Sequence, residues 1–187
     1  MAKTALVPVA DGSEEIEVVC IVDTLRRAGV DVTVASVMRR RQITASRQTV
    51  LVADCLIEDC RGLTFDLVVL PGGMPGAEHL HGDPDVCALL TGQRAAGRAI
   101  GAICAAPAVV LLPLGLLSGY RATCFPSFLP LLREAEGVTA LEERVVVDRD
   151  LMTSRGPGTA IEFALALVEH LLSTEVAVTI GQRMLAR

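Results

Sequence analysis

The stretch RAIGAICAAPAVVLLP (residues 98–113) places one cysteine between a buried strand and a helix. Residues 99–103 are small and apolar, as expected for a buried strand, and Cys104 ends that run. A helix-compatible run interrupted by Pro107 follows. Small residues on both sides of Cys104 let two backbone segments approach closely, which a nucleophile at a strand-to-helix turn requires. The common alternative is a buried, inert thiol, and the rest of the chain has to distinguish the two.

Short apolar runs alternate with longer helical patterns along the whole chain. The runs that predict strands are residues 4–10, 31–37, 49–54, 66–70, 99–103 and 120–125, with a hairpin in 144–154. The helical patterns are residues 12–29, 83–97, 156–173 and 174–185, with a further helix after the cysteine. Continuous hydrophobic strands separated by helices predict a mostly parallel sheet covered on both faces. We therefore expect one α/β domain over residues 1–187, built as a three-layer sandwich.

Composition and charge exclude several classes of protein. Of the 187 residues, 51% are hydrophobic and only 3% are aromatic, which suits small aliphatic side chains packed between helices and a sheet. The net charge of −5 argues against nucleic acid as a main partner. The sequence shows neither a secretory signal pattern nor an uninterrupted apolar run of membrane-spanning length. We expect a soluble cytoplasmic protein without a membrane partner.

The cysteines and histidines do not form a recognisable metal or disulfide pattern. Six cysteines and three histidines are present, and no two cysteines form a C-x-x-C pair. Their spacing fits neither a disulfide scaffold nor a zinc site. We therefore expect mostly reduced, buried thiols, no metal and no cofactor.

Three strand ends carry residues suited to chemistry, and in a parallel sheet such ends share one edge. After strand 4–10, Glu17 lies on the same helical face as Cys20 and Ile21, so its carboxyl group is expected to be buried. After strand 66–70, the turn LPGGMPG can direct backbone N–H groups into a cleft, although a plain tight turn is the better explanation of this motif by itself. Cys104 follows the third strand. Because all three sites fall at adjacent ends, we favour a functional cysteine.

The motifs occur together in an order that resembles the ThiJ/PfpI superfamily. They are EEIE, VVLPGG, AAPA after AIC, and LMTSRGPGTAIEFALALVE, and the resemblance runs from about residue 4 to 180. The most similar subgroup is that of the parkinsonism-associated protein deglycase and bacterial YajL. The resemblance implies a flavodoxin-like α/β sandwich with a nucleophile-elbow cysteine, assembled as a homodimer.

The resemblance also assigns roles to individual residues. Cys104 would be the reactive nucleophile, and the Glu17 carboxyl group would hydrogen-bond its thiolate. The backbone N–H groups of Gly73 and Ala105 would form the oxyanion pocket. Arg47 matches an arginine that approaches the pocket from the partner subunit. We further expect Glu17 to be protonated at neutral pH while the cysteine is a thiolate, because two adjacent negative charges in a desolvated pocket are unfavourable.

Two departures from the family pattern narrow the chemistry. Phe125 stands where the animal deglycase has a histidine, and YajL also has phenylalanine at this place. Together with Arg47 and Gly72, Phe125 is predicted to bind the substrate. Protease-like members have histidine directly after the cysteine, whereas this chain has Ala105. That argues against peptidase and glutamine amidotransferase chemistry, which need a base. His79 and His81, just beyond the glycine turn, are a weaker possibility for such a base.

These observations lead to one leading hypothesis and two rivals. The leading one is a cofactor-free, cysteine-dependent hydrolase or lyase that protects against glyoxal, methylglyoxal and their adducts on Arg, Lys or Cys side chains. The first rival is a redox-sensing chaperone in which Cys104 is oxidised to a sulfinate. A thiamine-biosynthesis role is weaker, since no phosphate-binding signature supports it. The expected partners are a second copy of the chain and small α-oxoaldehydes or glycated side chains.

Overall fold

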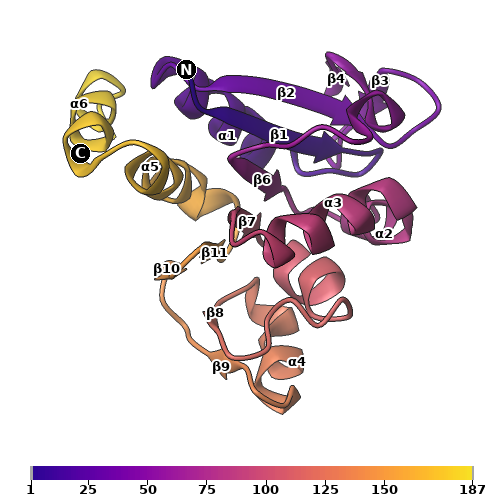
Figure 1. Ribbon diagram of the computed structural model, residues 1–187, viewed down its shortest axis with the longest axis vertical. Coiled ribbons are helices and arrows are strands. Elements are labelled where there is room, and N and C mark those ends of the chain that lie inside the picture. Colours follow the sequence, from indigo (N-terminus) through magenta and orange to yellow (C-terminus); the bar gives the residue numbers. More distant parts are fainter. Residues whose placement is uncertain (1, 187) are drawn as a thin grey trace.

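A seven-stranded sheet forms the centre of the computed structural model, which describes residues 2–186 (Figure 1). In spatial order its strands are β10 (Val145–Asp148), β11 (Leu151–Ser154), β7 (Ala99–Ile103), β6 (Leu67–Leu70), β1 (Thr4–Val9), β2 (Asp31–Ser36) and β5 (Cys55–Leu56). Neighbours run parallel except in the β10–β11 hairpin at one edge. The predicted mostly parallel sheet and the predicted hairpin are confirmed.

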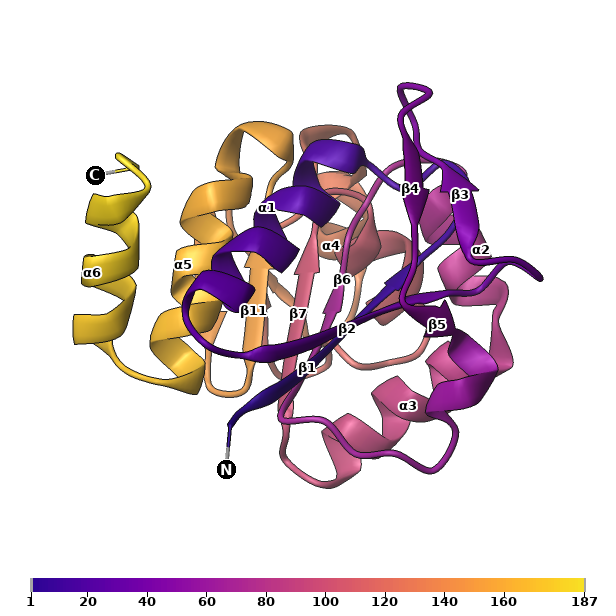
Figure 2. The same cartoon turned by 90° about the horizontal axis from the view of Figure 1, so that it is seen from above.

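Helices cover both faces of this sheet, as the sequence predicts. They are α1 (Glu15–Arg27), α2 (Gly76–Gly82), α3 (Pro84–Ala95), α4 (Leu129–Glu134), α5 (Ala160–Leu171) and α6 (Thr174–Arg183). Helices α1 and α5 lie side by side on one face, with α6 packed against α5, whereas α3 lies across the sheet from them (Figure 2). The result is the three-layer sandwich expected from alternating strands and helices.

Two predicted strands lie outside the central sheet. The run 49–54 forms only β4 (Val50–Val52), which pairs with β3 (Gln42–Thr44) in a separate hairpin. Its apolar side chains remain largely in solvent, since Val50 is 53% and Val52 is 66% exposed. The run 120–125 forms only β8 (Arg121–Ala122), paired with β9 (Thr139–Ala140). In both places the apolar run predicted extended backbone correctly. It did not indicate that the strand would pair outside the central sheet.

The segment after Cys104 also differs from a regular helix. Residues Pro107–Leu111 form a π-helical turn, closed by a 3.0 Å hydrogen bond from the Leu112 N–H to the Pro107 carbonyl. Proline cannot donate a backbone hydrogen bond, so Pro107 and Pro113 both interrupt regular helical pairing here. The remaining turns connect this segment to a small outer lobe that contains β8, β9 and α4 (Figure 1).

The core lies on both faces of the central strands. All residues of β6 and β7 are buried, and α5 packs on β7 through Phe163 and Leu167. In the part of the chain that the structure describes, no helix combines the length and the hydropathy needed to cross a membrane.

Candidate functional site

Strands β1, β6, β7 and β11 lie next to one another in the sheet, and their carboxyl ends meet at one edge. Cys104 follows β7 directly. Its backbone N–H donates to the Ser154 carbonyl at 3.0 Å, and its own carbonyl accepts from the Phe125 N–H at 2.8 Å. These two hydrogen bonds, from the end of β11 and from the outer lobe, hold the backbone of the cysteine on both sides.

Cys104 has a strained backbone conformation. Its φ angle is +63°, in the left-handed region that residues with a Cβ atom rarely adopt. Such a conformation costs on the order of 1–3 kcal/mol and persists only where neighbouring contacts enforce it. The side chain is 9% exposed, so the thiol is nearly enclosed. A strained residue between a strand and a helical turn matches the geometry of a nucleophile elbow.

The turn after β6 brings backbone against this cysteine. A Cβ atom on Gly72 would lie 2.6 Å from the Cys104 Cβ, and a Cβ on Gly73 would lie 2.4 Å from the Gly12 carbonyl oxygen. Both positions therefore require glycine, and Gly73 also has a φ of +85°. The N–H groups of Gly73 and Ala105 are directed at the Cys104 sulfur as hydrogen-bond donors. The two predicted oxyanion donors thus meet at the thiol.

Glu17 approaches the same thiol from the first turn of α1. The helix begins after Glu14, whose carboxylate accepts from the Glu17 N–H at 2.8 Å. The Glu17 side chain is fully buried, and its Oε2 accepts a 2.7 Å hydrogen bond from the Gly72 N–H. Its Oε1 is also buried and has no partner with full hydrogen-bond geometry within residues 2–186, although the carboxyl group does interact with the thiol of Cys104. One carboxyl oxygen is therefore available to exchange a proton with the sulfur.

Burial raises the pKa of Glu17 to about 7, against a smaller opposing effect of the Gly72 N–H. The charge of Glu14 adds to the increase, and the interaction with Cys104 reduces it. A carboxyl group with a pKa near neutrality can accept and return a proton at physiological pH. The expectation of a raised Glu17 pKa agrees with this environment.

The expectation of a resting Cys104 thiolate does not agree with it. Burial raises the pKa of Cys104 to about 12, the Glu17 charge adds to the increase, and the N–H groups of Gly73 and Ala105 only partly offset it. Desolvation of the sulfur therefore outweighs the donors on which the prediction relied. Burial therefore favours the protonated form of the thiol in the folded chain.

The remaining predicted residues lie at different distances from this centre. Phe125 is 39% exposed, with its ring against Gly156 and its N–H bound to the Cys104 carbonyl. Arg47 lies in the β3–β4 turn, where its guanidinium contacts the Ser46 carbonyl at 3.3 Å. Within residues 2–186 of this single chain, no hydrogen bond or ion pair joins Arg47 to the cysteine.

Neither histidine beside the glycine turn is bonded to the thiol. The ring of His79 contacts the Asp11 carbonyl through Nδ1 at 3.1 Å, and the Nδ1 of His81 is buried without a partner among residues 2–186. The described residues contain no cluster of three or more His, Cys, Asp or Glu side chains placed to hold a metal ion.

Sequence reasoning missed two supports of the site. Glu15, in the first turn of α1, is buried and accepts from the Arg47 N–H at 2.9 Å and the Ser46 hydroxyl at 2.9 Å. Burial opposes the ionisation of Glu15, yet these hydrogen bonds lower its pKa overall. Ser154, whose carbonyl holds the cysteine, is itself fixed by a 2.6 Å contact with the Thr159 hydroxyl. Of the two, only Ser154 lies in a motif that the sequence shows, SRGPGT at residues 154–159.

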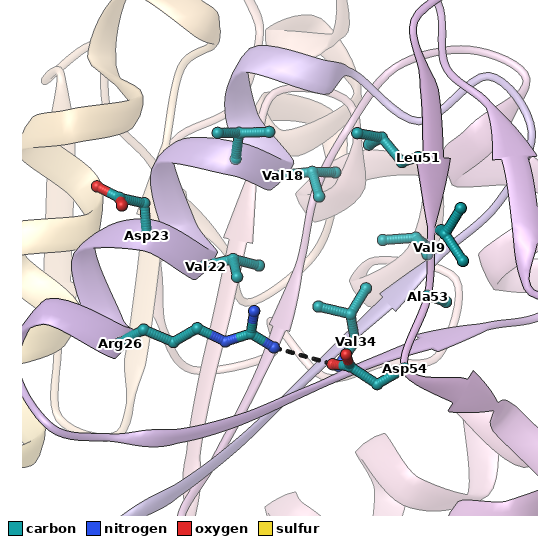
Figure 3. A pocket seen from close by; sticks show the side chains of 11 residues that line it. Val9, Val18, Val22, Asp23, Arg26, Val34, Leu51, Ala53 and Asp54 are labelled. Carbon is teal, nitrogen blue, oxygen red and sulfur yellow. Dashed lines mark hydrogen bonds and ion pairs between the residues drawn. The ribbon is translucent and has the colours of Figure 1, made fainter.

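An apolar groove lies apart from this centre, between α1 and β4 (Figure 3). Val18 and Val22 from the helix face Leu51 across it, and a 2.9 Å ion pair between Arg26 and Asp54 closes one end. None of the predicted site residues lines the groove.

Comparisons with known proteins agree with this geometry. Residues 3–170 match the DJ-1/PfpI family. The chain is 44% identical over 180 residues to Protein DJ-1 homolog B of Arabidopsis thaliana, which covers 96% of this chain but 40% of that protein. The chain thus spans less than half the length of this plant relative. It is also 38% identical over 170 residues to the Glutathione-independent glyoxalase DJR-1.2 of Caenorhabditis elegans, covering 91% and 88% of the two chains.

A solved structure shows the same fold over nearly the full length. Oxidized DJ-1 of Toxoplasma gondii superposes with a TM-score of 0.94 at 45% identity, covering 98% of each chain. The predicted flavodoxin-like fold and the predicted family resemblance are both confirmed by these similarities.

Proposed function

Because the chain belongs to the DJ-1/PfpI family, we propose that it is a cofactor-free, cysteine-dependent enzyme acting on methylglyoxal, glyoxal and their protein adducts. The observation that carries the proposal is the strained Cys104, whose sulfur is met by the Glu17 carboxyl group and by two backbone N–H donors. A relative named as a glutathione-independent glyoxalase supports the same class of reaction.

The reaction begins with addition of the Cys104 sulfur to the aldehyde carbon of the substrate. The thiol proton passes to the Glu17 carboxylate, because burial raises the pKa of the thiol and favours its protonated form. The N–H groups of Gly73 and Ala105 hold the oxygen that gains negative charge. The product of this step is the oxyanion of the hemithioacetal, and Glu17 is now a carboxylic acid beside it. Return of this proton to the oxygen gives the neutral hemithioacetal and restores the Glu17 carboxylate, which can then accept the carbon proton.

Proton transfers then convert the hemithioacetal into product. For methylglyoxal, the proton on the former aldehyde carbon leaves and a proton is delivered to the neighbouring ketone carbon, which produces an enzyme-bound lactyl thioester. Water cleaves the thioester to lactate and restores the thiol. Glu17 is the group positioned to carry these protons, a contribution of roughly 10²–10⁴ in rate for general acid–base catalysis.

The surroundings of the thiol favour a small substrate. Gly72, Gly73 and Ala105 leave little side-chain bulk around the sulfur, while Phe125, whose N–H is bonded to the Cys104 carbonyl, is partly exposed. We assign Phe125 to substrate contact, which allows both free two- or three-carbon aldehydes and adducts on a protein side chain.

A homodimer is part of the proposal. On α1, Ile16 is 52% and Val19 is 50% exposed, an apolar surface that a second copy of the chain would cover. In the dimer, Arg47 of one copy would contribute to the pocket of the other. We also propose a cytoplasmic location, which cell fractionation tests.

Lactate production from methylglyoxal without glutathione tests the proposed reaction. We expect turnover by the wild-type chain, loss with Cys104→Ser, and retention with the control Cys87→Ser, which changes a half-buried thiol on α3. Absence of turnover in a folded wild-type protein would contradict the proposed activity.

One observation favours the redox-sensing alternative as a second function of the same pocket. The Glu17 carboxyl group, whose Oε1 has no other partner within residues 2–186, and the N–H groups of Gly73 and Ala105 could bind the oxygens of a Cys104 sulfinate. Titration with hydrogen peroxide followed by mass spectrometry should then show Cys104 gaining two oxygen atoms before Cys124 does. Oxidation of Cys124 first would remove this alternative.

A further inference from the structure

Two cysteines outside the Cys104 pocket lie in contact with each other. Cys55 is in the edge strand β5, and Cys60 is the last residue of the short helix η1 (Ile57–Cys60). Their sulfur atoms are 3.8 Å apart, and both thiols are free. We propose that Cys55 and Cys60 form a reversible dithiol–disulfide pair, a second oxidation site that works independently of Cys104.

Hydrogen bonds hold the backbone on both sides of the pair. The Asp54 N–H donates to the Val34 carbonyl at 2.8 Å before the pair, and the Leu63 N–H donates to the Cys60 carbonyl at 3.1 Å after it. Between them, the Asp59 carboxylate accepts from the Leu56 N–H at 3.0 Å and closes the turn. The expectation that cysteine spacing leaves the thiols unpaired considered only the sequence, whereas this turn folds a C-x-x-x-x-C segment back on itself.

Closing the bond needs little movement. A disulfide requires a sulfur–sulfur separation of about 2.05 Å, so the two atoms must approach by about 1.8 Å from 3.8 Å. Rotation about the Cα–Cβ bonds is the motion that moves the sulfurs toward each other.

The two thiols differ in access, which defines the order of steps. Cys55 is half-buried, whereas Cys60 is 1% exposed. A peroxide therefore meets Cys55 first: its sulfur attacks one peroxide oxygen, the O–O bond breaks, and a sulfenic acid and water result. The Cys60 sulfur then attacks the Cys55 sulfur, the S–O bond breaks, and a second water leaves. Two thiols are oxidised by two electrons, and one peroxide is reduced to two waters.

Burial raises the pKa of Cys60 to about 12, and the neighbouring Cys55 adds to the increase. The second step is therefore expected to accelerate with increasing pH, because the thiolate is the attacking form.

The pair is far from the proposed catalytic centre. Strands β6, β1 and β2 lie between β7, which ends at Cys104, and the edge strand β5. Four spacings of about 4.8 Å between neighbouring strands separate the two sites by roughly 19 Å. Oxidation of one site does not require a thiol from the other.

Peptide mapping of the full chain tests the pair directly. Trypsin cleavage after Arg47 and Arg61 releases residues 48–61, which contain both cysteines, and each of the other four cysteines lies in a separate tryptic peptide. The chain is treated with hydrogen peroxide, alkylated and digested. We expect peptide 48–61 to be unalkylated and two hydrogen atoms lighter than its reduced form, with dithiothreitol restoring two alkylation sites.

Variants separate this site from Cys104. The same disulfide is expected in Cys104→Ala and in the control Cys87→Ser, and it should be lost in Cys55→Ser and in Cys60→Ala. Loss of the disulfide in Cys104→Ala would overturn the independence of the two sites. The pair itself would be overturned if wild-type peptide 48–61 still carried two alkylated thiols after Cys104 is fully oxidised. A sulfinate at Cys55, or a cross-link from this peptide to a different one, would overturn it as well.

Discussion

The buried carboxyl group of Glu17 should make the stability of the protein depend on pH in a characteristic way. Its pKa rises from an ordinary value of 4.5 to about 7 in the folded chain, chiefly through burial. Between these two values the unfolded chain has already lost the proton while the folded chain retains it. Increasing pH through this window therefore destabilises the folded state, and below the window the effect is absent.

The size of the effect follows from the two pKa values. Each pH unit in the window contributes about 1.4 kcal/mol, so the interval from 4.5 to about 7 amounts to about 3 kcal/mol once the pH exceeds the upper value. Glu17→Gln has no proton to lose but retains an oxygen that can accept from the Gly72 N–H. The variant should therefore gain about 3 kcal/mol relative to wild type between pH 4.5 and 8.

Urea unfolding of both proteins at half-unit pH intervals measures this difference, since other titrating groups cancel between them. Glu143→Gln, which changes a glutamate exposed to solvent, is the matched control for the loss of one carboxyl group. A constant difference for Glu17→Gln would refute the reasoning, because Glu17 would then titrate alike in the folded and unfolded chains.

Three further predictions concern the site and the assembly. Turnover of methylglyoxal should increase as the pH passes about 7, because Glu17 then becomes able to accept the thiol proton. Glu17→Gln cannot accept this proton, so its initial rate should be at least 100-fold lower than that of the wild type. Gly72→Ala would place a Cβ 2.6 Å from the Cys104 Cβ, so activity should fall by about 100-fold or more; unchanged kinetics would contradict the close approach. Light scattering of the wild type should give the mass of two 19.7 kDa chains. Val19→Glu places a charge on the exposed face of α1, so this variant should give the mass of one chain. A monomeric wild type would remove the proposed role of Arg47.

The sequence by itself determined the main architecture and the identity of the central residues. Alternating apolar runs and helical patterns predict the parallel sheet, because hydrophobic periodicity is a local property of each segment. The small residues around Cys104 and the paired glycines after β6 predict close approach of backbones, and the apolar face of α1 predicts burial of Glu17. These conclusions depend only on residue size, polarity and spacing along the chain.

Only the tertiary structure decided which groups affect one another. Strand β4 lies outside the central sheet, although the apolar run 49–54 that contains it resembles those of β1 and β6. The pKa of Cys104 rises because the folded chain removes water from the sulfur, an effect stronger than the N–H donors that the sequence places beside it. The contact between Cys55 and Cys60 likewise depends on a turn anchored to β2. Electrostatic energies and contacts between thiols depend on distance and solvent exclusion, and those quantities exist only after distant segments have packed together.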